Sequence, residues 1–130
     1  MKEKISITAI ASLSPLGSTI EETWAAYQNN DHYFSLAKEN GNTSWVAPLS
    51  PAAKIKVDEL RNSDTKYKKL DDSVLFAMVA SRLAVQKSGW ENTAEFGINM
   101  GSSRGATKLF EQYHKEWYFI NLKLTNNHIR

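Results

Sequence analysis

The sequence predicts an α/β fold in which helices flank a parallel or mixed sheet and a small hairpin accompanies it. Segments with strand character alternate along the chain with segments of helical periodicity, as in α/β proteins. Residues 5–11 and 96–100 are strand-like runs rich in apolar side chains, which is typical of buried strands. The length of 130 residues suits one domain with one modest core.

The N-terminal elements are a strand and a capped helix. The strand over 5–11 ends at the turn-forming run Leu13-Ser14-Pro15-Leu16-Gly17. Ser18 stands three residues before Glu21, which is the spacing of a capping box. Apolar side chains then recur at helical intervals, at Ile20, Trp24 and Tyr27. The spacing predicts a helix over about 19–29.

A hairpin and a short helix are predicted next. Residues 34–37 and 45–47 have strand character and flank Asn40-Gly41-Asn42, which favours a tight turn. The following stretch, 48–69, is polar and rich in charge. It predicts one short helix near 52–60.

A long helix should follow, with Asp71 or Asp72 as its N-cap and Gly89 as its end. Only two polar residues interrupt the run 74–85, so apolar side chains point almost all the way round. Such a helix needs cover on more than one side. Adjacent aspartates project about 100° apart on a helix, so capping explains Asp71 and Asp72 better than paired acid–base catalysis.

The run after the second strand is a candidate binding loop. Residues 101–105, Gly-Ser-Ser-Arg-Gly, lie between the strand 96–100 and a helix predicted over about 106–117. Backbone amides at such a junction can hold an anion. The run lacks the P-loop and dinucleotide motifs, and glycines serve tight turns for conformational reasons alone. The candidate substrate-binding residues are Ser102, Ser103, Arg104 and Gly105.

Several classes of chemistry are excluded or disfavoured. The chain contains no cysteine, which excludes disulfides, thiolate metal sites and a cysteine nucleophile. The histidines, His32, His114 and His128, do not share a metal-ligand spacing. We therefore expect no metal, no cofactor and no catalytic residue in these 130 residues.

Charge and hydropathy favour a cytoplasmic protein. The net charge of +2 does not indicate a nucleic-acid partner. The longest apolar run, 75–80, is too short to cross a bilayer. The N-terminus MKEKISITAIAS has some features of a signal peptide, but Glu3 and the short, interrupted apolar stretch favour a strand.

Two blocks of the sequence resemble the β-ketoacyl-acyl-carrier-protein synthase family. The family opens with a strand, a turn reading SPLG or SPVG, and a helix containing Trp. The stretch ISITAIASLSPLGSTIEETWAAYQNN is similar to this opening. Its next long helix, second core strand, glycine-rich turn and following helix resemble DDSVLFAMVASRLAVQKSGW and FGINMGSSRGATKLFEQYHKEW. The resemblance covers about residues 5–115.

The resemblance implies part of a thiolase-like fold, which in the family comprises two α/β halves and is usually dimeric. It also implies acyl transfer with carbon–carbon bond formation on a cysteine supported by two histidines. In the family these residues follow the matched region, so none is carried over to this chain. Arg104 stands where many members have a small or apolar residue near the acyl pocket, which argues against an ordinary fatty-acyl pocket.

The C-terminal residues 117–130 no longer resemble the family, so residues 1–116 are interpreted as a ketosynthase N-terminal-like region and 117–130 as a divergent tail. A gene remnant and a short paralogue would both give this pattern. We expect a truncated homologue or fragment of 3-oxoacyl-ACP synthase that is inactive alone. The alternatives are a non-enzymatic module that binds a full-length ketosynthase or acyl carrier protein, and a small ligand-binding protein that uses the loop 101–105.

Truncation also predicts self-association. The apolar helix and the two strands would lack the layers that cover them in the family, leaving hydrophobic patches. We expect a homo-oligomer in which residues 117–124 add a strand or cover the core.

Overall fold

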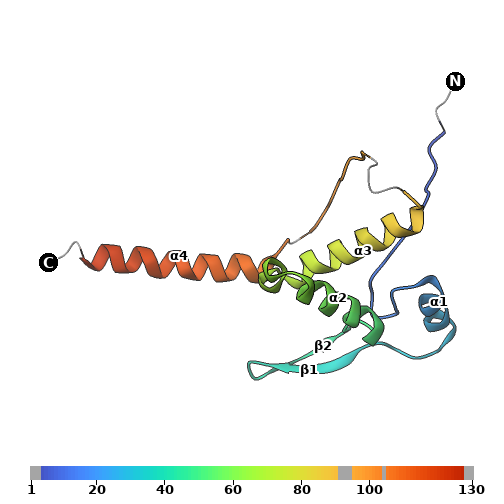
Figure 1. The fold of residues 1–130 in the computed structure, drawn as a ribbon. Coiled ribbons are helices and arrows are strands. Elements are labelled where there is room, and N and C mark those ends of the chain that lie inside the picture. The colour runs from blue at the N-terminus through green and yellow to red at the C-terminus, as the bar shows by residue number, and fades with distance from the viewer. Residues whose placement is uncertain (1–3, 91–94, 104, 128–130) are drawn as a thin grey trace.

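A computed structural model describes residues 4–90, 95–103 and 105–127, with residues 120–127 described by their backbone alone. Figure 1 shows helices, one hairpin and two long extended segments. The elements are α1 (Ile20–Gln28), β1 (Ser35–Glu39), β2 (Asn42–Val46), α2 (Pro51–Ser63), the 3₁₀ helix η1 (Thr65–Lys69), α3 (Asp72–Ser88) and α4 (Thr107–Asn127). The described chain is therefore mixed α/β with most of its regular structure in helices.

Helix α1 confirms the prediction, although its cap lies one residue later than expected. The N-cap is Thr19, whose hydroxyl accepts a hydrogen bond from the amide of Glu22 at 3.1 Å. The Glu22 carboxylate in turn accepts from the Thr19 amide at 3.2 Å, which completes a capping box. The predicted pair of Ser18 and Glu21 is thus wrong as the capping box.

The hairpin is also confirmed. Strands β1 and β2 pair antiparallel from Ser35 opposite Val46 to Glu39 opposite Asn42. The two turn residues, Asn40 and Gly41, both have positive φ angles, 50° and 83°. Asparagine and glycine adopt this conformation most readily, and it matches the twist of the strands. The Asn-Gly pair therefore sets the register.

Helices α2 and α3 begin and end at residues that the sequence favours. Ser50 caps α2 and Pro51 occupies its first turn. Asp71 caps α3, whose C-cap Gly89 has a φ angle of 70° in the left-handed region. The predicted boundaries of α3 are confirmed, and α2 extends three residues beyond its predicted end at residue 60.

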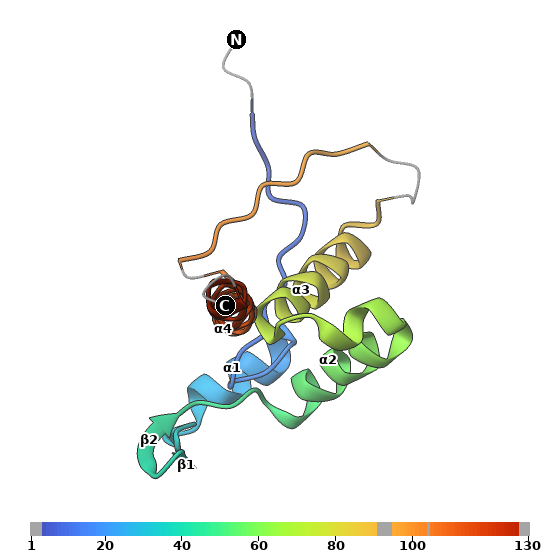
Figure 2. The same cartoon turned by 90° about the vertical axis from the view of Figure 1, so that its left-hand side faces the viewer.

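The core lies between α2 and α3, which run side by side in both views (Figures 1 and 2). Val57 and Leu60 of α2 pack with Leu75 and Val79 of α3. Half-buried side chains surround them, namely Leu13, Leu49, Tyr67, Leu70, Phe76, Met78 and Leu83. Only Leu75 and Val79 of α3 are buried, so this helix receives less cover than its apolar sequence predicts.

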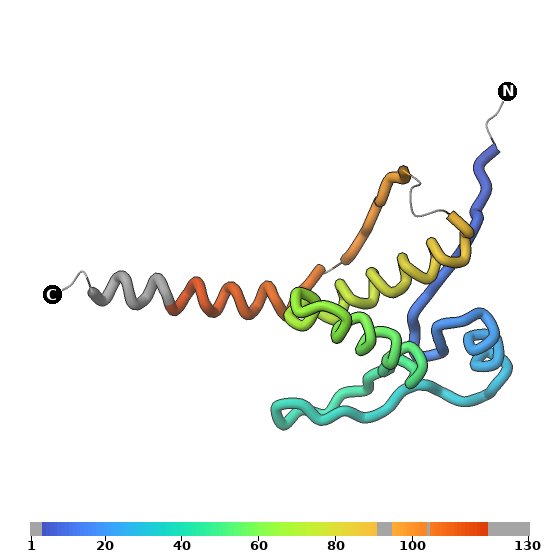
Figure 3. Tube along the Cα trace, in the orientation of Figure 1, coloured from blue at the N-terminus to red at the C-terminus, as the bar shows by residue number. Residues whose placement is uncertain are grey.

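The predicted parallel or mixed sheet is wrong for the described residues. Their one sheet is the two-stranded antiparallel hairpin. Residues 5–11 and 96–100 follow extended paths without forming strands (Figure 3). Their side chains are exposed, with Ile7 at 79% and Ile98 at 76%. A run of apolar residues with strand character indicates side chains that favour burial, but a strand forms only where a neighbouring strand can hydrogen-bond to it.

Helix α4 continues well beyond the predicted end at residue 117 and points away from the other helices (Figure 1). Residues 107–127 contain no glycine or proline that would stop it. The expected strand at 117–124 is therefore wrong, because these residues are helical, while core cover by them in an oligomer stays a prediction. The boundary at residue 117 between a ketosynthase-like region and a divergent tail stays a prediction.

In the described part of the chain, no helix combines the length and apolar character that a bilayer crossing requires.

Candidate functional site

The turn Ser14-Pro15-Leu16-Gly17 fixes the path into α1. The Gly17 amide donates to the Ser14 carbonyl at 3.2 Å, and the Ser14 amide donates to the Gly17 carbonyl at 3.0 Å. The amide of Ser50 also donates to the Ser14 carbonyl, at 3.4 Å, and so joins the turn to the start of α2. Gly17 has a φ angle of 145°, and a Cβ atom there would lie 2.5 Å from Cβ of Glu22. This position therefore requires glycine.

A buried polar cluster follows the turn and links α1 to α2. Ser18 is only 2% exposed, and its hydroxyl accepts a hydrogen bond from Nζ of Lys56 at 2.7 Å. The same hydroxyl and the Ser18 amide lie 3.2 and 2.7 Å from Oε2 of Glu22 and donate to it. Hydrogen bonds from the Ser18 amide, the Ser18 hydroxyl and the Thr19 amide hold the pKa of Glu22 below its ordinary range.

This serine–lysine contact has the composition of an activated nucleophile, but its geometry is structural. The Ser18 hydroxyl already donates to the Glu22 carboxylate, and the residue is only 2% exposed. A nucleophile must reach the reacting atom. The cluster therefore stabilises the junction between α1 and α2.

Three of the four predicted binding residues, Ser102, Ser103 and Gly105, lie in the loop before α4. The Gly105 amide donates to Oγ of Ser102 at 2.8 Å, and Gly105 has a φ angle of 64°. Ser103 is exposed, and Arg104 lies outside the described residues. Gly105 also borders a cavity of about 280 Å³ that Asp71 and Asp72 line. Lys108 lines the same cavity, so its charged groups are of both signs, and substrate binding by the loop stays a prediction.

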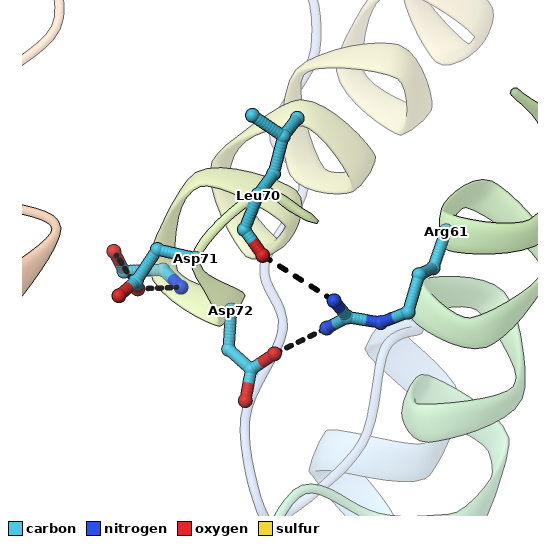
Figure 4. Close-up of polar contacts among 5 residues, drawn as sticks. Arg61, Leu70, Asp71 and Asp72 are labelled. Carbon is cyan, nitrogen blue, oxygen red and sulfur yellow. Dashed lines mark hydrogen bonds and ion pairs between the residues drawn. The ribbon is translucent and has the colours of Figure 1, made fainter. Parts of the chain in front are cut away.

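The two aspartates act in capping and ion pairing (Figure 4). Oδ1 of Asp71 accepts from the hydroxyl and the amide of Ser73, at 2.7 and 2.9 Å, and these bonds lower the pKa of Asp71. Asp72 forms an ion pair with Arg61, whose guanidinium also donates to the Leu70 carbonyl at 3.3 Å. The interpretation of Asp71 as a cap is confirmed.

A groove of about 360 Å³ lies where α2, η1, α3 and α4 meet, and it carries more positive than negative groups. Its cationic lining residues are Arg61, Lys68, Lys69 and Lys108, and its acidic ones are Asp71 and Asp72. Asp72 is neutralised by Arg61. The described part of the chain gives the ammonium groups of Lys68, Lys69 and Lys108 no ion-pair partner. The groove therefore offers three cationic groups to an anionic partner.

Sequence reasoning did not single out this groove. The signal was the run Thr-Lys-Tyr-Lys-Lys at 65–69, which places several lysines in one short helix. The meeting of this run with Lys108 depends on the tertiary fold and is not visible in the sequence.

The histidines are dispersed. His32 lies edge-on to Trp45 with ring centroids 6.4 Å apart, and His114 stacks on Phe110 at 6.4 Å. His128 lies outside the described residues. Within the described ranges, no three or more histidine and carboxylate groups gather closely enough to hold a metal ion.

Sequence comparison supports a partial relationship to the condensing enzymes named 3-oxoacyl-[acyl-carrier-protein] synthases. The chain is similar to 3-oxoacyl-[acyl-carrier-protein] synthase 2 of Vibrio cholerae, with 25% identity over 118 residues. The aligned part is 88% of this chain and 28% of that relative, so the chain spans a little over a quarter of its length. No family profile matches the chain. No solved structure matches it either, so a thiolase-like fold stays a prediction.

Proposed function

We propose that the chain is a fragment of a condensing enzyme of the 3-oxoacyl-ACP synthase kind, corresponding to its N-terminal portion. The observation that carries this proposal is the similarity over 118 residues to one part of the Vibrio synthase. The fixed turn at residues 14–17 is consistent with it, because the structure gives the SPLG run a conformational role that requires glycine at its end.

The fragment does not catalyse condensation by itself. Condensation by covalent catalysis needs a nucleophile that carries the acyl group, and a thiolate is the nucleophile that the resemblance implies. These 130 residues contain no cysteine. Ser18, the serine that contacts a lysine, does not replace it, because this residue is only 2% exposed and its hydroxyl proton is already donated to Glu22.

The test is an assay of the purified 130-residue chain with acyl- and malonyl-loaded acyl carrier protein. We expect no condensation product, while the Vibrio cholerae synthase under the same conditions supplies the positive control. Formation of product at a rate that scales with the concentration of the chain would overturn the proposal of inactivity.

A second function, binding of an acyl carrier protein without catalysis, is favoured by the cationic groove. Lys68, Lys69 and Lys108 face one groove, and the described residues leave their charges unpaired. Groups of this kind attract an anionic surface or a phosphate and accelerate its association. The Vibrio relative is named for an acyl-carrier-protein substrate, so the groove is a candidate docking surface for that protein.

Binding is tested by titrating a fluorescently labelled acyl carrier protein with the chain at low salt. The double variant Lys68→Ala/Lys69→Ala should weaken binding about five- to tenfold, since each exposed charge contact contributes up to about 1 kcal/mol. The control Lys38→Ala/Lys54→Ala removes the same charge at exposed positions outside the groove and should leave the Kd within about twofold. Equal loss in both variants would show a nonspecific charge effect and contradict the docking site.

A further inference from the structure

The turn of the hairpin carries a pair of residues that can react with each other. Asn40 is the only asparagine of the sequence that is followed by a glycine. The backbone nitrogen of the next residue can attack an asparagine carboxamide, and a glycine there presents no Cβ to obstruct the attack. Both Asn40 and Gly41 are exposed, and a Cβ built on Gly41 meets no atom within 4 Å. Solvent therefore reaches both reacting groups.

The reaction that these groups permit is deamidation through a cyclic imide. The Gly41 nitrogen loses its proton to hydroxide and bonds to Cγ of Asn40, and the carboxamide nitrogen leaves as ammonia. Water then opens the ring at one of its two carbonyl carbons. Opening at one of them gives aspartate, and opening at the other gives isoaspartate, in which the main chain runs through Cβ and Cγ. Water and hydroxide are the co-reactants.

The closed hairpin leaves the attacking nitrogen outside its ladder but holds the asparagine backbone away from the geometry of attack. The last pair of the ladder is Glu39 opposite Asn42, so the Gly41 amide lies beyond it. Asn40 has a φ angle of 50°, in the left-handed region. The Gly41 nitrogen must turn toward the side chain for the ring to close, which requires the Asn40 backbone to leave this region. Attack therefore needs the turn to open.

The hairpin has little support from the rest of the molecule. Every residue of β2 is exposed, and in β1 only Ala37 is half-buried. Within the described residues, the two strands pair with each other and pack extensively on no other element. A two-stranded hairpin without such packing is at best marginally stable in water. The turn therefore opens readily while the core between α2 and α3 stays folded.

We propose that Asn40-Gly41 is a site of spontaneous deamidation, that opening of the hairpin sets its rate, and that the isoaspartate product prevents the hairpin from closing again. The closed turn depends on positive φ angles at both residues, which fit the twist of the strands. Isoaspartate lengthens the main chain of this turn by a carbon atom, so the turn no longer fits the strands. It also places a carboxylate beside Glu39, and neighbouring like charges repel.

Peptide mapping by mass spectrometry tests the site on the full chain after incubation at mildly alkaline pH. We expect Asn40 to convert to aspartate and isoaspartate at least about tenfold faster than Asn99. Asn99 is the matched control, because it is also exposed and lies outside any strand of the described chain but is followed by Met100. Equal rates at the two asparagines would overturn the proposal.

Two variants separate attack by the glycine from opening of the hairpin. Gly41→Ala weakens the turn, since alanine disfavours a φ angle of 83°, but its Cβ obstructs the attack. It should deamidate about tenfold more slowly than the original chain. Trp45→Ala removes the cross-strand partner of Leu36 and should deamidate about two- to fivefold faster, because the hairpin opens more often. Faster reaction in Gly41→Ala, or an unchanged rate in Trp45→Ala, would overturn the proposal.

NMR of the isoaspartate form, isolated by chromatography, tests the structural consequence. Cross-peaks between β1 and β2 should disappear, while those between Val57 and Leu75 in the core should remain. Strand pairing that survives in the isoaspartate form would overturn the proposed block to closing. None of these measurements depends on condensation or carrier-protein binding, so this site and the proposed function can fail independently.

Discussion

At the level of single residues, the Ser18 hydroxyl is the polar group on which the junction of α1 and α2 depends. It is buried, accepts from Lys56 and donates to Glu22. Ser18→Ala removes both bonds and leaves the lysine without this acceptor. We expect the free energy of unfolding to fall by about 1–3 kcal/mol in urea denaturation. Ser12→Ala, at an exposed serine, should change it by less than about 0.5 kcal/mol. Equal effects would contradict the structural role of Ser18.

The Glu22 carboxylate makes the free energy of unfolding depend on pH. Its folded-state pKa lies below its ordinary value of 4.5 because the Ser18 amide, the Ser18 hydroxyl and the Thr19 amide bond to the charged form. A group with a depressed folded pKa contributes stability above the unfolded pKa and loses it as the pH falls through the folded pKa. Stability should therefore decline below about pH 4.5.

Glu22→Gln separates this contribution from that of the other carboxylates. Glutamine at the third helical position keeps an acceptor for the capping amides but does not titrate. The variant should show a shallower loss of stability between pH 5 and about pH 3. Asp64 and Asp71 also have lowered pKa values, so some loss remains. Urea unfolding over this range measures the slope, and an unchanged slope would show that Glu22 does not contribute.

At the level of elements, the turn at residues 14–17 is the part least tolerant of an added methyl group. Gly17→Ala would set Cβ 2.5 Å from Cβ of Glu22 in a backbone conformation that disfavours alanine. We expect a loss of at least about 3 kcal/mol, with reduced helix signal in circular dichroism. Gly89→Ala is the matched control, since a Cβ there meets no atom within 4 Å and should cost only about 1–2 kcal/mol. A smaller loss at Gly17 than at Gly89 would contradict the observed packing.

The elements that the sequence predicted correctly are those whose boundaries are set by local chemistry. Asp71 and Gly89 bound α3, and Asn40-Gly41 closes the hairpin, because each residue acts within its own few neighbours. The strands at 5–11 and 96–100 depend instead on partner strands distant in sequence or in another chain. The alternation of apolar residues indicates which face of a strand favours burial, but it does not show which strand lies beside it.

The same distinction applies to the candidate site. The capping role of Asp71 was predictable because its acceptor and donors are two residues apart. The contact of Lys56 with Ser18 spans 38 positions, and the groove joins lysines of η1 to Lys108 of α4. These arrangements depend on how α2, α3 and α4 pack, so no local pattern predicts them.

At the level of the whole molecule, burial is concentrated in a small part of the chain. The buried apolar residues of the described chain are Ala26, Ala53, Val57, Leu60, Leu75 and Val79. Large side chains elsewhere are exposed, including Trp24, Trp45 and Trp117 at 63–65%. Since burial of apolar surface is the dominant favourable term in folding, the stability of one isolated copy rests mainly on the α2–α3 contact.

Leu75→Ala tests this dependence. Leu75 is 0% exposed and is the largest fully buried side chain, so truncating it removes apolar contacts and leaves a cavity at a cost of about 2–5 kcal/mol. A core of this size has little stability in reserve, because even ordinary domains are stable by only about 5–15 kcal/mol. We expect cooperative urea unfolding to be lost or its midpoint to fall sharply. Leu36→Ala, at a residue 59% exposed on the hairpin, should leave the midpoint nearly unchanged. If both variants unfold alike, the core that holds the chain together lies elsewhere.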